Sequence, residues 1–91
     1  MSIQWLFEVI QSRKEEPREG SYTSALFAEG LPRIAQKVGE EGTEVVVAAL
    51  AQNNQRLIEE VADLTYHTLV LLAACGLSPA DVQAELEKRH K

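Results

Sequence analysis

The chain is poor in cysteine and in basic residues, and both shortages narrow what it can do. Its 91 residues include one cysteine, Cys75, which excludes an intrachain disulfide and a zinc site built from several thiolates. A reduced, cytoplasmic setting is therefore expected. Nine basic residues against fourteen acidic ones give a net charge of −5, so we expect no binding of nucleic acid through phosphate neutralisation. A phosphorylated small molecule still fits if metal ions supply the positive charge.

Aromatic residues are also few, and no apolar run reaches the length of a membrane span. Trp5 and Phe7 fit the apolar side of an amphipathic first helix, with no aromatic platform for stacking bases. The most apolar stretch, residues 62–74, is too short to cross a membrane and is interrupted by Asp63 and His67. The first residues lack the basic segment and cleavage site of a secretory signal. We expect neither a membrane segment nor a leader.

Helical spacing of apolar residues and the placement of proline and glycine predict about five helices and no strand. The expected helices cover residues 3–14, a short segment capped by Ser21 or Thr23 and ending at Gly30, residues 32–52, a segment from the Asn53–Asn54 turn to Cys75, and a last one from Ser78-Pro79 to Lys88, Arg89 and Lys91. Residues 62–74 are apolar on nearly every side of their helix, which calls for cover on several sides. We expect a single all-α helical-bundle domain, residues 1–91, with its core completed by homodimerisation.

Two short acidic motifs carry the chemistry. Glu41 and Glu44 lie three residues apart in one expected helix, and Glu60 and Asp63 lie three apart in the next. Residues with this spacing are neighbours on a helix surface. Two antiparallel helices joined by a short turn can therefore bring four carboxylates together, and oxygen donors of this kind suit Mg²⁺.

The position of the acids relative to the apolar faces strengthens this interpretation. At about 100° per residue, Glu41 falls roughly 20° from Ile34, inside the apolar stripe of its helix. Burying ionised carboxylates costs several kcal/mol each unless a cation compensates. In the next helix the expected seam is flanked by Glu60, Asp63 and His67 and is lined by Leu57, Val61, Leu64, Thr68 and Leu71. Gly39 and Gly42 are expected to allow close packing against another helix.

Each motif also has a simpler interpretation. An acidic pair on a helix is more often a solvated, ion-paired face, although Lys37 and Arg56 are too few to pair all of these acids. His67 could orient Asp63, contact substrate or serve the core, and the structural role is slightly favoured. Tyr66 falls on the far side of its helix from the seam, as a dimer contact or a surface residue. The triplet of residues 21–23 fits a helix cap or a phosphate contact.

Together these motifs closely resemble the phosphoribosyl-ATP pyrophosphatase family of histidine biosynthesis, within the all-α nucleotide pyrophosphohydrolase superfamily. The resemblance covers nearly the whole chain. The two acidic motifs alone indicate the superfamily, and three further motifs narrow it to this branch: Ser21-Tyr22-Thr23, the string Lys37-Val38-Gly39-Glu40-Glu41 with Glu44, and Tyr66-His67 after Asp63. Thr65 stands where the family pattern has an aliphatic residue, and this difference affects packing rather than chemistry.

The resemblance implies Mg²⁺-dependent hydrolysis of the α–β phosphate bond of phosphoribosyl-ATP, giving phosphoribosyl-AMP and pyrophosphate in the second step of the pathway. It implies metal ligation by Glu41, Glu44, Glu60 and Asp63, with Glu40, Glu41 and Glu44 as catalytic acids and Glu40 as a ligand through water or the group that orients the attacking water. Lys37 would meet phosphate, and the remaining substrate contacts would come from Ser21, Tyr22, Thr23, Tyr66 and His67. The chain has no room for the cyclohydrolase domain fused to some relatives, so a free-standing form is expected.

Two other functions compete with this expectation. A housecleaning pyrophosphohydrolase of free or modified nucleoside triphosphates would share the acidic motifs. A non-enzymatic helical dimerisation module would leave the acids solvated, and its thermal stability would not respond to Mg²⁺.

Overall fold

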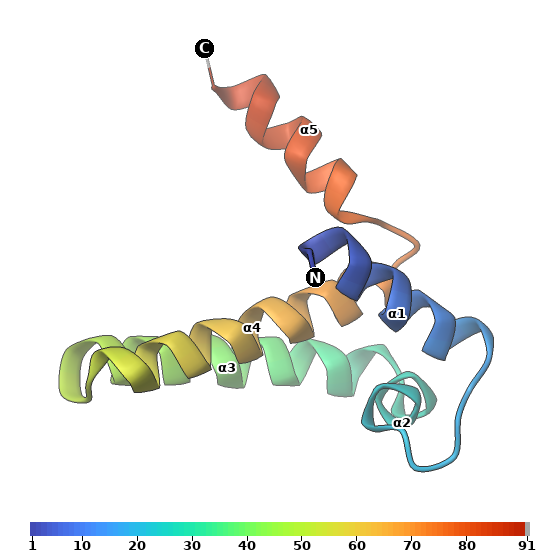
Figure 1. Cartoon of the computed structure of the whole chain (residues 1–91), viewed down its shortest axis with the longest axis horizontal. Helices are drawn as coiled ribbons and strands as arrows, with labels where there is room; N and C mark the ends of the chain where they lie inside the picture. The colour runs from blue at the N-terminus through green and yellow to red at the C-terminus, as the bar shows by residue number, and fades with distance from the viewer. Residues whose placement is uncertain (91) are drawn as a thin grey trace.

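A computed structural model describes residues 1–90 and shows five α-helices (Figure 1). They are α1 (Ile3–Glu15), α2 (Tyr22–Glu29), α3 (Leu31–Ala51), α4 (Asn54–Ala74) and α5 (Pro79–Arg89). The expected all-α fold is confirmed, since residues 1–90 contain no strand. Lys91, placed by the sequence near the end of the last helix, lies outside the described residues.

The helix starts follow the capping signals. Ser2 accepts a hydrogen bond from Trp5 N at 3.0 Å, Ser21 from Ser24 N at 3.1 Å and Asn53 from Arg56 N at 2.9 Å. These side chains satisfy backbone donors that have no partner inside the helix. Of the two caps considered for α2, Ser21 is the one used.

Glycine provides two of the helix junctions. Gly30 has φ +95° between α2 and α3, and Gly76 has φ +72° just after α4. Residues with a Cβ rarely adopt this left-handed region, so glycine permits an abrupt end to the preceding helix. Pro32 lies in the first turn of α3, where its missing N–H costs nothing.

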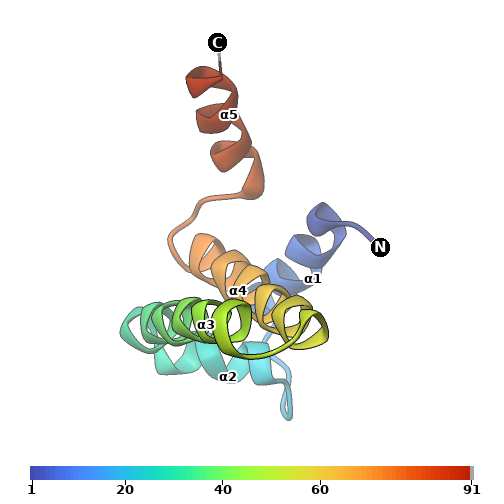
Figure 2. The ribbon, with the colours of Figure 1, turned by 90° about the vertical axis from the view of Figure 1, so that its left-hand side faces the viewer.

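The molecule is built on a hairpin of α3 and α4, which run antiparallel along each other (Figures 1 and 2). Helices α1 and α2 pack at the end of this hairpin where α3 begins and α4 finishes, and α5 projects away from the other four. Figure 2 shows α1 and α2 on different sides of the hairpin. At the opposite end of the hairpin, around the turn at Asn53, no other helix of the described residues packs against α3 and α4.

A small hydrophobic core joins the first four helices at the covered end of the hairpin. Its most buried large side chains are Ile10, Leu26, Ile34 and Val70, each at most 1% exposed. The buried residues of this core cluster are Phe7, Ile10, Leu26, Ile34, Leu69, Val70 and Ala73. No residue of α5 is buried. The core therefore fixes one end of the hairpin and leaves its middle and its turn to carry other groups.

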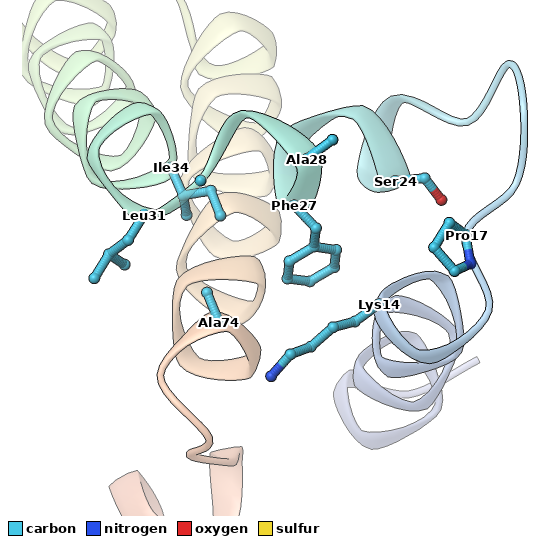
Figure 3. A pocket seen from close by; sticks show the side chains of 9 residues that line it. Lys14, Pro17, Ser24, Phe27, Ala28, Leu31, Ile34 and Ala74 are labelled. Carbon is cyan, nitrogen blue, oxygen red and sulfur yellow. The ribbon is translucent and has the colours of Figure 1, made fainter.

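A pocket of about 390 Å³ lies beside this core, between α1, α2 and the adjoining ends of α3 and α4 (Figure 3). Phe27, Leu31 and Ile34 give it an apolar lining, and the ammonium group of Lys14 donates a hydrogen bond to the carbonyl of Ala73 at 2.7 Å. This bond ties the end of α1 to the last turn of α4. None of the acidic motif residues lines the pocket.

One sequence expectation about packing is wrong. Val61, predicted to line the seam of α4, is 43% exposed, whereas Glu60 and His67, predicted to flank it, are buried. Within residues 1–90, a Cβ added at Gly39 or Gly42 would meet nothing within 4 Å, so these glycines do not serve close packing inside the chain.

No single helix among the described residues has the length and apolar character to cross a membrane. Helices α4 and α5 pass that test only as a pair, and they are bent by 103° at the break between them.

Candidate metal centre and active site

Three carboxylates from the two long helices come together in the middle of the hairpin, and we call them the acidic cluster. Oxygens of Glu41 on α3 and of Glu60 and Asp63 on α4 all lie within 4.8 Å of one another. The antiparallel arrangement of α3 and α4 makes this possible, because residues before the turn of one helix face residues after it on the other. Three of the four predicted ligands are therefore adjacent.

The cluster is graded from buried to exposed. The side chain of Glu41 is 12% exposed and that of Glu60 is 8% exposed, while Asp63 lies at the surface. Glu41 thus occupies the apolar stripe of α3, as its spacing from Ile34 predicts. Two nearly buried carboxylates beside an accessible one leave an open side from which a ligand can approach.

The surroundings of Glu60 disfavour its negative charge. Burial raises the pKa of Glu60, Arg56 counteracts it, and the neighbouring carboxyl groups of Asp63 and Glu41 raise the pKa further. The net result is a pKa above the usual range for glutamate. A protonated carboxyl or a bound cation would relieve this strain on the ionised form.

Glu44 and Glu40 lie on α3 outside the cluster. Glu44 is exposed, one turn beyond Glu41. Glu40 accepts a hydrogen bond from Gln36 at 3.0 Å and pairs with Lys37 at 3.4 Å, and these two contacts, in that order, hold its pKa below the usual value. Glu40 is therefore ionised at neutral pH.

Lys37 stands at the border of the cluster. Its ammonium lies 3.4 Å from Glu40 and 3.5 Å from Glu41, and its side chain is mostly covered. Burial lowers the pKa of Lys37, but the hydrogen bond to Glu40, the negative charge of Glu40 and the hydrogen bond to Glu41 outweigh it, so the pKa is raised overall. A permanent positive charge thus lies next to the acids.

His67 connects the cluster to α2 and has a defined tautomer when neutral. Its Nδ1 lies 2.8 Å from the carbonyl oxygen of Asp63, which can only accept, so Nδ1 carries the hydrogen. Its Nε2 lies 3.0 Å from the hydroxyl of Tyr22. In neutral His67 this nitrogen accepts, and Tyr22 donates. The imidazole therefore links the backbone at a cluster residue to the first turn of α2.

Tyr66 packs beside His67, contrary to its expected place on the far side of α4. Its ring centroid lies 5.0 Å from that of His67 and 6.3 Å from that of Tyr22, and its hydroxyl shares a hydrogen bond with Thr23. Burial raises the pKa of Tyr66, with partial opposition from the Thr23 hydrogen bond, so the phenol stays protonated. The error arose because the buried face of α4 extends toward α2, which helical spacing alone does not locate.

Residues 21–23 divide between capping and contacts across the fold. The Ser21 side chain is occupied as the cap of α2. Tyr22 and Thr23 instead point toward α4, where they contact His67 and Tyr66. These contacts join residues more than forty positions apart, and no local pattern predicts them.

Residues 4–90 match the family model described as phosphoribosyl-ATP pyrophosphohydrolase. The chain belongs to this family. Its sequence is 61% identical over 85 residues to a phosphoribosyl-ATP pyrophosphatase of Listeria welshimeri, with 93% of this chain and 82% of the relative covered. It is 58% identical over 86 residues to one of Pyrobaculum neutrophilum, covering 94% and 92% respectively. The family resemblance drawn from the motifs is confirmed.

A more distant relative gives the same assignment. A phosphoribosyl-ATP pyrophosphatase of Clostridium botulinum is 47% identical over 89 residues, which span 98% of this chain and 81% of the relative. The family is one of hydrolases.

Proposed function

We propose that the chain hydrolyses phosphoribosyl-ATP between the α and β phosphates, giving phosphoribosyl-AMP and pyrophosphate in the second step of histidine biosynthesis. The observation that carries this proposal is the meeting of Glu41, Glu60 and Asp63 on the α3–α4 hairpin of a phosphoribosyl-ATP pyrophosphohydrolase family member. The one cysteine, Cys75, lies after the end of α4, so no thiol nucleophile lies beside the cluster. Attack by water on the α phosphorus fits such a site.

The chemistry of the cluster fits Mg²⁺. Its donors are carboxylate oxygens, the ligands that hard divalent cations take, and its excess negative charge calls for a cation. We assign Glu41, Glu60 and Asp63 as ligands, with Glu44 as the fourth from the next turn of α3. When bound, Mg²⁺ supplies charge neutralisation for the phosphates and makes a bound water more acidic.

The residues around the cluster have separate tasks in this proposal. The Lys37 ammonium, already beside Glu41, contacts a phosphate oxygen. Glu40, ionised and exposed one residue away, orients the attacking water or holds the metal through a water. Both assignments rest on the charges of the two side chains, a positive Lys37 and a negative Glu40.

The wall formed by Tyr22, Thr23, Tyr66 and His67 then shapes the organic part of the substrate. Its aromatic faces and protonated hydroxyl groups lie on the side of the cluster toward α2. Ser21 acts through the fold, because its hydroxyl holds the first turn of α2.

We also propose that the chain works as a homodimer, in which a second copy covers the free end of the hairpin. Exposed apolar side chains gather on both helices near the turn: Val46, Val47 and Leu50 on α3, and Ile58 and Val61 on α4. Gly39 and Gly42 on α3 also leave open space that a helix of a second copy could enter. Covering this surface would supply apolar burial that the chain lacks when alone.

A panel of nucleotides tests the substrate. Pyrophosphate release from phosphoribosyl-ATP, ATP, dCTP and dUTP is measured with Mg²⁺ under identical conditions. The proposal predicts strong preference for phosphoribosyl-ATP. Preference for a free nucleoside triphosphate would assign a housecleaning role, and no turnover of any nucleotide would indicate a non-enzymatic module.

A further inference from the structure

The same short pattern occurs on both helices of the hairpin, and in each copy one cation contacts two glutamates. A basic residue is followed, three and four positions later, by adjacent glutamates; the two copies are Lys37, Glu40 and Glu41 on α3, and Arg56, Glu59 and Glu60 on α4. The first glutamate of each copy is the outer one, with its side chain 46% exposed in Glu40 and 45% in Glu59. The second is the inner one, and it belongs to the acidic cluster.

Arg56 divides its guanidinium between these two acids. Nη1 pairs with Glu59 and Nη2 pairs with Glu60. The inner pair is the more costly one to lose, because the Glu60 side chain is nearly buried and has two further carboxylates close by. Arg56 is therefore a positive charge already placed against the carboxylate that most needs one.

The two-armed contact has a consequence for any cation that enters the cluster. Nη2 occupies the Glu60 oxygen Oε1. A metal ion that binds this oxygen needs it free of the competing donor, and the ion repels the guanidinium. Release of Nη2 from Glu60 leaves Nη1 on Glu59, so Arg56 need not return to solvent. The outer glutamate can retain the displaced arginine beside the site.

We propose that Arg56 is the resident counter-cation of Glu60, which a divalent metal must displace, and that Glu59 holds Arg56 once it is displaced. This inference rests on the proposed metal role of the acidic cluster. It makes the pair Arg56 and Glu59 a determinant of metal affinity, although neither residue is a ligand.

The proposal predicts opposite effects for two substitutions. Arg56→Gln removes the competitor and should tighten Mg²⁺ binding about three- to tenfold. Glu59→Gln removes the alternative partner, so Arg56 stays on Glu60 and Mg²⁺ binding should weaken by a similar factor. Arg89→Gln is the control, because Arg89 pairs with Glu85, four residues before it on exposed α5, and lies outside the acidic cluster.

Isothermal titration of the intact, substrate-free protein with Mg²⁺ measures these affinities, and the rise in melting temperature with Mg²⁺ gives a second reading. Tighter binding in Arg56→Gln with weaker binding in Glu59→Gln supports the proposal. Equal affinities in Arg56→Gln and wild type would overturn it and leave the metal site standing. Weaker binding in Arg56→Gln would also overturn it, since Arg56 would then position Glu60 as a ligand. Absence of Mg²⁺ binding in the wild type would overturn both this inference and the proposed metal centre.

Discussion

At the scale of single residues, Glu60 joins the stability of the fold to the chemistry of the site. Burial and the nearby carboxylates raise its pKa despite Arg56. A raised carboxyl pKa means that the folded protein favours the protonated form. The stabilisation is fully present below the ordinary glutamate pKa and is lost as the pH rises through the folded value. At neutral pH, ionised Glu60 therefore costs stability in the absence of metal.

Glu60→Gln should accordingly raise the melting temperature of the metal-free protein at pH 7. The difference from wild type should shrink as the pH falls toward 4.5, the unperturbed glutamate value. Thermal melts across this pH range check it, with exposed Glu87→Gln on α5 as the control. A lower melting temperature for Glu60→Gln at pH 7 would mean that the Arg56 ion pair outweighs burial.

At the scale of elements, the hairpin depends on the core at its covered end. Ile34 joins α3 to this core and is 1% exposed. Ile34→Ala would leave a cavity that neighbouring helices cannot fill, which typically costs about 2–5 kcal/mol. Urea unfolding should show a loss of about 3 kcal/mol in the free energy of unfolding. Ile3→Ala is the control, because Ile3 is half exposed, and it should cost less than about 0.5 kcal/mol. Similar losses in both variants would contradict the assigned core.

The sequence predicted the elements better than their contacts. Apolar spacing indicated α1, and caps, glycines and proline indicated where the other helices begin or end, because these signals act within a turn or two of the chain. The exposure of Val61 and the inward position of Tyr66 were missed, because they depend on how α4 is placed in the fold. The Tyr66 hydroxyl, for example, contacts Thr23 on α2. Apolar periodicity defines the apolar face of a helix, but it does not show which other elements bury residues beside that face.

The candidate site was predictable to a similar extent. The sequence predicted that Glu41, Glu60 and Asp63 lie close together, because one short turn joins their helices. The Tyr22–His67 hydrogen bond could not, because it depends on where the fold places α2. The shared pattern of Lys37 and Arg56 was visible in the sequence, but its meaning needed the burial of the inner glutamates.

At the scale of the whole molecule, the free end of the hairpin distinguishes a monomer from a dimer. Leu50 is 83% exposed, so replacing it should not disturb the folded chain itself. If a second copy covers it, Leu50→Glu should weaken dimerisation about tenfold or more, since a buried leucine contributes about 1.5–3 kcal/mol. Sedimentation velocity over a range of concentrations measures this effect.

Leu86→Glu provides the comparison for that experiment. Leu86 is also exposed, but it lies on α5, away from the hairpin turn. Its replacement should leave dimerisation unchanged. A monomeric wild type at all concentrations would contradict the proposed dimer, and dissociation by Leu86→Glu alone would place the contact on α5.

The central claim is that the acidic cluster carries out the hydrolysis, and one comparison tests it most directly. Pyrophosphate release from phosphoribosyl-ATP is measured with Mg²⁺ for wild type, Asp63→Asn and the α5 control Glu87→Gln, with helical content checked by circular dichroism. Asp63→Asn keeps the shape of the side chain and removes its charge, so the account predicts a folded protein with at least about a hundredfold less turnover and unchanged activity in Glu87→Gln. Near-normal turnover by folded Asp63→Asn would contradict the account.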